Sequence, residues 1–332
     1  MRIIASANQK GGCGKTTTAI NLGSSLALKN QKTLLIDFDP QAHASMGLDI
    51  KPSDLEKSMY DVMRPGGMTS TGIEDILIPI KDNFDLAPSS AALSAVEQEL
   101  SGVDGRESML LNAIESLSEP YDFIIIDCPP SIGHLCFNAL RACQEVIIPI
   151  DMSLFSLRGV SKLLEIAILL QEKLGHEIRS RALITMYDVR TRYSRRVLEK
   201  VKEEFGENVY ETVIRYNIRL RETVDYGLPI GDYDKRSIGH MDYENLAVEV
   251  LGAEAYSLEE DSDSLKASYD ILQRTEEFMD VFSQSSTPDI LPPKRDEISG
   301  SVSEASYADI TESILADSRG SVFTLEDEME EF

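Results

Sequence analysis

The sequence has few cysteines, no long apolar run and little positive charge. Its four cysteines, Cys13, Cys128, Cys136 and Cys143, form no C-x-x-C pair and have no histidine cluster beside them, so neither a zinc site nor a disulfide framework is indicated. The opening MRIIASANQK is too short and too polar for a signal peptide, and no apolar run approaches the length of a membrane span. We therefore expect a cytoplasmic protein without a membrane segment.

The shortage of positive charge has one local exception. The 332 residues include 57 acidic and 32 basic side chains, a net charge of −25, which argues against nucleic acid and anionic membranes as partners. Residues 179–221, however, contain 11 basic and six acidic residues, and nine of the basic ones are arginine. Arginine is favoured where phosphate is bound, so this segment is a candidate for phosphate contact.

Short β-branched runs alternate with longer periodic segments. The runs predict strands at 2–7, 32–38, 121–130, 145–150 and 181–186, and the periodic segments predict helices that include 15–29, 106–117, 156–173 and 191–205. Nearly continuous apolar strands are typical of a parallel sheet that is covered on both faces. We therefore expect an α/β fold with a doubly wound, mostly parallel sheet and ligands beyond the carboxyl ends of the strands.

The composition changes towards the end of the chain. We expect one α/β domain over residues 1–252, an additional helical segment packed on it over 253–283, and a mostly disordered acidic tail over 284–332. The tail has 12 acidic and three basic residues. A solvated spacer and a short element that folds on binding both remain open for it.

The stretch NQKGGCGKTTT, from Asn8 to Thr18, has the composition of a phosphate-binding loop between a strand and a helix. The motif G-x-x-x-x-G-K-[ST] would need glycine at position 9, where this chain has Gln9. The remainder supplies three glycines, a lysine for the β and γ phosphates at Lys15 and a hydroxyl for Mg²⁺ at Thr16. An ordinary glycine-rich turn does not require two lysines and three threonines.

Three aspartates follow predicted strands directly. LLIDFDPQ contains Asp37 and Asp39, and FIIIDCPPS contains Asp127. A single aspartate at a strand end is more often a turn or cap residue. Three of them beside a phosphate loop favour a nucleotide and metal site, with Asp127 holding Mg²⁺ directly or through water.

Lys10 to Thr16 resembles the deviant Walker A motif K-G-G-x-x-K-[ST] of the ParA/MinD group of P-loop ATPases, and it matches that motif at every position. The resemblance implies a P-loop NTPase fold, ATP and Mg²⁺, and a homodimer that sandwiches two ATP molecules. It implies that Lys15 serves its own ATP and Lys10 that of the partner, and that Asp39 orients the attacking water. The implied nucleotide ligands are Lys10, Gly11, Gly12, Cys13, Gly14, Lys15, Thr16 and Thr17, and the implied metal residues are Thr16, Asp37 and Asp127.

Within that group, DFDPQ and DCPPS resemble the ParA branch of the small, Soj-like type, with no room for an N-terminal helix-turn-helix domain. MinD-like chains end in a basic membrane helix, whereas this chain ends TLEDEMEEF, so no membrane binding is expected. The branch implies nonspecific binding to double-stranded DNA through Arg190 and Arg219, association with the nucleoid and a ParB-like partner that stimulates hydrolysis. Met186 and Asn217 would contact the adenine.

Three other basic residues of the arginine-rich segment 179–221 favour a structural interpretation. Arg195, Arg196 and Lys200 suit a helix surface on which basic side chains pair with glutamates. The family's usual YDPRSRGA is replaced by YDKRSIGHMDY, so a basic contribution after Lys235 and Arg236 is not supported.

Two other functions stay open. One is an orphan ParA-type ATPase that positions a protein cargo. The other is an iron–sulfur reductase of the nitrogenase iron-protein type, which shares the deviant loop but requires paired cysteines that ligate a cluster at a dimer interface.

Overall fold

The computed structural model describes residues 1–66, 70–153, 155–252 and 263–284. Residues Met1–Asp280 form one compact unit. The predicted acidic tail, apart from Gln284, lies outside the described residues.

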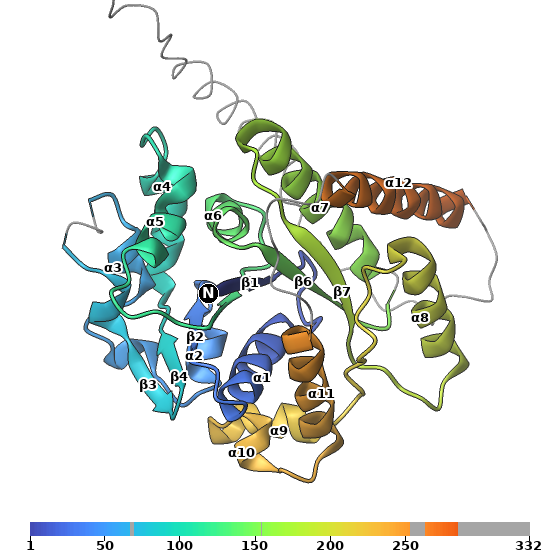
Figure 1. The fold of residues 1–332 in the computed structure, drawn as a ribbon, viewed down its shortest axis with the longest axis horizontal. Helices are drawn as coiled ribbons and strands as arrows, with labels where there is room; N and C mark the ends of the chain where they lie inside the picture. The colour runs from blue at the N-terminus through green and yellow to red at the C-terminus, as the bar shows by residue number, and fades with distance from the viewer. Residues whose placement is uncertain (67–69, 154, 253–262, 285–332) are drawn as a thin grey trace, which may run out of the picture. The chain divides into compact units, whose positions relative to one another are not determined.

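A seven-stranded sheet forms the centre of this unit (Figure 1). Its strands are β1 (Arg2–Ser6), β2 (Thr33–Asp37), β3 (Ile78–Lys81), β4 (Phe84–Ala87), β5 (Phe123–Asp127), β6 (Glu145–Ile150) and β7 (Arg179–Ile184). The spatial order is β3-β4-β2-β5-β1-β6-β7, and every neighbouring pair is parallel except β3 with β4. The predicted doubly wound, mostly parallel fold is confirmed.

Helices cover both faces of the sheet, with α1 beside α11 on one face and α6 beside α7 on the other (Figure 1). The helices are α1 (Lys15–Leu28), α2 (His43–Met46), α3 (Met59–Met63), α4 (Val96–Glu99), α5 (Met109–Glu115), α6 (His134–Ala142), α7 (Phe155–Leu174), α8 (Arg192–Phe205), α9 (Arg219–Tyr226), α10 (Ile230–Tyr233), α11 (Ile238–Gly252) and α12 (Asp263–Gln284). Among the described residues, no helix has both the length and the apolar character needed to span a membrane.

The five predicted strands correspond to β1, β2, β5, β6 and β7. The edge hairpin of β3 and β4 was not predicted. Each of these two strands has only four residues, and Pro79 in β3 has no N–H to give to a ladder. A short edge strand that is partly exposed carries little of the apolar signal that identifies the central strands.

The register of the central strands fixes the position of three polar side chains. Asp37, the last residue of β2, is the register partner of Asp127, the last residue of β5. Asp127 is in turn the register partner of Ser6, the last residue of β1. These three residues therefore lie side by side at the carboxyl edge of the sheet. The glycine-rich loop leaves the sheet at this same edge, shortly after Ser6.

Helix α12 packs on the outer side of α7. Ser268, Ile271 and Thr275 are buried, and the hydroxyl of Tyr269 donates a hydrogen bond to Glu172 Oε1 at 2.5 Å. Figure 1 shows α12 alongside α7. The sequence predicts an additional packed helical segment over residues 253–283. Helix α12 begins inside that range and ends one residue after it, at Gln284.

Gly227 provides a test of the packing beneath α9. It ends that helix in the left-handed region, with φ of 63°, and a Cβ at this position would lie 2.8 Å from the backbone nitrogen of Asp49. We expect Gly227→Ala to lower the free energy of unfolding by more than about 2 kcal/mol, because strain at φ above zero adds to a clash with backbone. Urea unfolding measures this loss.

Gly175→Ala is the matched control, because Gly175 has φ of 61° but nothing lies within 4 Å of the added Cβ. It should lose only the strain, about 1 kcal/mol. Equal losses in the two variants would show that the contact with Asp49 has no energetic weight.

Candidate active site

The glycine-rich loop joins β1 to α1 and exposes backbone N–H groups at the start of that helix. Gly12 and Gly14 have φ of 75° and 101°, a region that residues with a Cβ rarely adopt. Gly14 immediately precedes Lys15, the first residue of α1. The N–H groups of a helix N-terminus, together with its dipole, favour a bound anion. The loop therefore has the conformation of a phosphate cradle.

Hydrogen bonds from the sheet hold this loop in place. The Ser6 hydroxyl donates to the Lys15 carbonyl at 3.0 Å, and the Thr185 hydroxyl donates to the Cys13 carbonyl at 2.7 Å. The Lys15 side chain is buried, and its ammonium donates to the Lys10 carbonyl at 3.1 Å. The last residue of β1 and the first residue after β7 thus fix the loop from two sides.

The two adjacent carboxylates at the sheet edge have different surroundings. Asp37 Oδ2 accepts hydrogen bonds from the backbone N–H and the hydroxyl of Ser45, both at 2.7 Å, and Asp37 Oδ1 accepts one from the N–H of Asp39 at 3.3 Å. Burial raises the pKa of Asp37 to about 7, although the bonds from Ser45 oppose this. Asp37 therefore orders the segment between β2 and α2.

Asp127 is fully buried, and neither of its oxygens has a hydrogen-bond partner among the described residues. Burial and the charge of Asp37 raise its pKa well above the ordinary value, and the nearby Thr16 and Lys15 offset this only in part. Buried carboxylate oxygens are nearly always satisfied, and oxygen ligands are those that Mg²⁺ prefers. The donor set of Asp127 and Thr16 therefore fits a divalent cation.

Asp39 lies just beyond β2 and is buried, with 6% of its surface exposed. Its Oδ1 accepts a hydrogen bond from the N–H of Gln41 at 2.9 Å. This local turn holds the carboxylate beside the Asp37 and Asp127 pair, whose pKa values both include a contribution from the Asp39 charge. Its position is compatible with the water-orienting role that the resemblance implies.

Lys10, at the entrance of the loop, makes contacts quite unlike those of Lys15. Its ammonium binds Asp151 and donates to the Ser153 hydroxyl at 2.6 Å, and a quarter of its side chain is exposed. Burial acts to raise the pKa of Asp151, but the hydrogen bonds from Lys10 and Ser156 outweigh it, and the pKa is lowered. Lys10 thus points towards the end of β6, away from Lys15.

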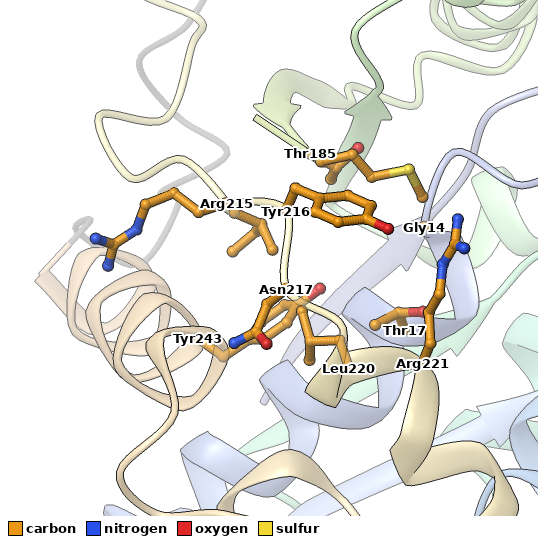
Figure 2. Close-up of a pocket in the computed structure, with 11 residues that line it drawn as sticks. Gly14, Thr17, Thr185, Arg215, Tyr216, Asn217, Leu220, Arg221 and Tyr243 are labelled. Carbon is orange, nitrogen blue, oxygen red and sulfur yellow. The ribbon is translucent and has the colours of Figure 1, made fainter. Parts of the chain in front are cut away.

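A pocket beside the loop is formed by segments that are far apart in the sequence (Figure 2). Met186 and Asn217, the two residues predicted to contact the adenine, both line it, and Met186 has φ of 54°. At its floor the Tyr243 hydroxyl lies 3.2 Å from the Thr18 hydroxyl. The remaining lining residues are Gly14, Thr17, Thr185, Ile214, Arg215, Tyr216, Leu220 and Arg221.

Arg190 and Arg219 line a single surface hollow, which also includes Arg215 and Arg236. Arg190 and Arg219 each form an ion pair with a carboxylate. Arg190 donates to Asp188 Oδ1 and Oδ2 at 2.9 and 2.7 Å, and these bonds lower the pKa of Asp188 to about 2. Arg219 donates to Glu222 Oε2 at 2.7 Å. Exposed pairs of this kind are weak, so a competing phosphate can displace the carboxylates.

The predicted pairing on α8 is only partly correct. Lys200 pairs with Glu203 and Glu204, as predicted. Arg195 and Arg196 are exposed and have no ion pair among the described residues. Spacing along a helix permits such pairs, but the side-chain rotamers decide which of them form.

The comparisons with known proteins bear on this arrangement. A family model described as an AAA domain matches residues 1–180. The sporulation initiation inhibitor protein Soj of Bacillus subtilis is 42% identical over 251 residues, which is 75% of this chain and 98% of Soj. The chromosome partitioning protein ParA of Caulobacter vibrioides is 37% identical over 258 residues, 76% of this chain and 95% of that protein.

The chain belongs to the ParA/Soj family of P-loop ATPases. Among solved structures, cobyrinic acid a,c-diamide synthase from Mycobacterium smegmatis, with bound ATP analog and magnesium, matches 76% of this ParA-type chain and 94% of its own, with a TM-score of 0.66 and 31% identity. The ATP complex of a Cyanothece McdA variant shares the fold, with a TM-score of 0.67 and 21% identity, over 77% of this chain and 99% of its own.

The cysteines of this ParA-type chain give no support to the iron–sulfur alternative. All four thiols are buried, and burial raises the pKa of each, that of Cys136 to about 12. Within the described ranges, no group of three or more histidine, cysteine or acidic side chains is arranged to hold a metal. A cluster shared by two subunits requires thiolates at the surface of each.

Sequence reasoning missed two residues that hold Lys10 and the loop, and several that line the pocket. Asp151 directly follows β6, so the strand-end signal that identified Asp37 and Asp127 applied to it as well. Thr185 likewise follows β7. The pocket residues Arg215, Tyr216, Arg221 and Tyr243 carry no local motif.

Asp127→Ala tests the assignment of the unpartnered carboxylate. In the unaltered protein, Mg²⁺ together with ATP should raise the melting temperature further than ATP alone, because the cation compensates a buried carboxylate that accepts no hydrogen bond among the described residues. Asp127→Ala should lose most of this additional rise. EDTA should lower the melting temperature of the unaltered protein to the value that it has with ATP alone. A full Mg²⁺ response in Asp127→Ala would place the metal elsewhere.

Proposed function

We propose that this chain is a Mg²⁺-dependent ATPase that closes into a homodimer around two ATP molecules, binds double-stranded DNA without sequence preference in that state, and partitions chromosomes or plasmids with a ParB-like partner. Its ATPase activity follows from membership of the ParA/Soj family. ATP and Mg²⁺ agree with the ligands of the synthase structure. The names of two relatives support the partitioning role. The proposed DNA binding rests on the resemblance to the ParA branch and on the arginine-lined hollow, and the ParB-like partner rests on the resemblance alone.

The observation that carries the dimer is the separation of the two lysines of one loop. Lys15, which follows the loop as the first residue of α1, is buried against it, whereas Lys10 is directed to Asp151 and Ser153 and is partly exposed. A lysine that serves the phosphates of its own loop should be directed as Lys15 is. Lys10 has the exposure needed to exchange Asp151 for the phosphates of a partner subunit.

Symmetry explains how so acidic a protein binds DNA. One subunit offers the hollow lined by Arg190 and Arg219 on a chain of net charge −25, and general repulsion opposes binding. A closed dimer presents two hollows to one duplex, which roughly doubles the counterions released. DNA binding then depends on ATP, and release follows hydrolysis. The protein is then located in the cytoplasm and associates with the nucleoid in its ATP-bound state.

Lys10→Ala tests the closure step. In an Asp39→Ala background, where loss of the water-orienting carboxylate should stop hydrolysis, ATP should yield a stable dimer detectable by light scattering. Adding Lys10→Ala should leave a monomer that still binds ATP, because Lys15 remains. A normal ATP dimer of Lys10→Ala, or an unchanged ATPase rate of Asp39→Ala, would refute the role given to that residue.

Arg190→Ala and Arg219→Ala test the DNA surface in the ATP-locked dimer. Each should reduce the slope of log affinity against log salt by about 2, because one change removes two phosphate contacts per dimer. Arg195→Ala is the matched control, since Arg195 is an exposed arginine of α8 outside the hollow. If the ATP-locked dimer shifts no unrelated duplex at low salt, positioning of a protein cargo becomes the better account.

A further inference from the structure

The pocket beside the loop contains two arginines with opposite environments. Arg215 is committed to the protein: its guanidinium donates to both oxygens of Asp242, and its backbone N–H donates to Asp242 Oδ2 at 2.9 Å. Arg215 therefore braces the wall of the pocket against α11, and the carboxylate of Asp242 neutralises its charge.

Arg221 has no such partner. It lies in the first turn of α9, its side chain is exposed, and its guanidinium lies 5.7 Å from the centre of the Tyr216 ring. In the part of the chain that the structure describes, it forms no ion pair with any carboxylate. Arg221 thus brings an uncompensated positive charge to the pocket.

The location of that charge indicates its ligand. Arg221 lines the same pocket as Gly14 and Thr17, which flank Lys15 and Thr16 of the phosphate loop. Figure 2 shows the Arg221 side chain extending along the pocket towards Gly14. A guanidinium beside the start of α1 faces the region between the base pocket and the phosphate cradle, where the sugar and the first phosphate of a nucleotide must pass.

We propose that Arg221 is a nucleotide-binding residue that contacts the ADP part of ATP, on its sugar and α-phosphate side. Arginine suits this task because its planar fork binds phosphate oxygens and also stacks on rings. A purely structural role is a weaker explanation, because a single exposed stacking contact with Tyr216 contributes little to stability.

The contact also connects the nucleotide to the arginine hollow through one short helix. Arg219 and Arg221 are two residues apart in α9, so their side chains leave the helix about 200° apart. Asn217, which lines the pocket, accepts a hydrogen bond from the N–H of Arg219 at 2.9 Å through its Oδ1. A nucleotide held by Arg221 fixes α9 and thereby the position of Arg219. This consequence, unlike the nucleotide contact, rests on the proposed DNA binding.

The test measures binding of fluorescent ADP and ATP analogues to the full chain, without DNA. Arg221→Ala should weaken binding of both by about tenfold, the loss expected for one charge-assisted hydrogen bond. The ratio of the ADP and ATP affinities should stay unchanged, because the contact is to the part that they share. Arg221→Lys should recover part of the affinity, and KM should rise more than kcat falls.

Arg195→Ala is the control of equal charge change and should bind both nucleotides normally. The melting temperature of Arg221→Ala without nucleotide should match that of the unaltered protein. Unaltered ADP binding by Arg221→Ala would overturn the proposal, and so would a loss confined to ATP, which would place the contact at the γ-phosphate. Because no DNA is present, a failure of the DNA-binding proposal cannot produce either result.

Discussion

The register of β2, β5 and β1 is the constraint on which the site depends. It aligns Asp37, Asp127 and Ser6 at one edge of a sheet that is buried on both faces. Two adjacent carboxyl groups in such surroundings cannot both ionise without compensation, and the pKa of each is raised. Ser45 and Asp39 compensate Asp37 by hydrogen bonds, whereas the oxygens of Asp127 accept none from the described residues. The buried Lys15 and the N-terminus of α1 add positive potential at the same edge, so groups of both signs meet where the phosphate-binding loop begins its helix.

One short segment forms part of two surfaces. Arg215, Tyr216 and Asn217 line both the pocket beside the loop and the hollow that contains Arg190 and Arg219. The segment runs beside β7, through a bridge between Tyr187 and Arg215, and is held to α11 by Asp242. The pocket and the hollow therefore share one wall, so a substitution in this segment alters the lining of both. Arg215 is held in this wall by the buried carboxylate of Asp242, whereas the nearby Arg219 pairs with the more exposed Glu222.

The sequence was sufficient to predict the central sheet and the loop, because both have strong local signals. Continuous apolar strands and the spacing of Lys10, the glycines and Lys15 need no knowledge of tertiary contacts. The β3–β4 hairpin was missed because both strands have only four residues and β3 is partly exposed, so the apolar pattern is weak. The ion pairs of Arg190 and Arg219 could not be predicted, because side-chain rotamers determine them. The pocket brings together residues from Gly14 to Tyr243, and only the fold places these residues side by side.

The burial of the four cysteines has a practical consequence for experiments on this protein. Thiols react as thiolates, and burial with a raised pKa suppresses the thiolate at neutral pH. Cys13 belongs to the phosphate loop itself, yet it is packed inward and its thiol donates to the Lys10 carbonyl. We therefore expect the four thiols of the folded chain to react slowly with maleimides. A cysteine introduced on the exposed face of α8 would take up a fluorophore or spin label selectively, with every native residue of the loop retained.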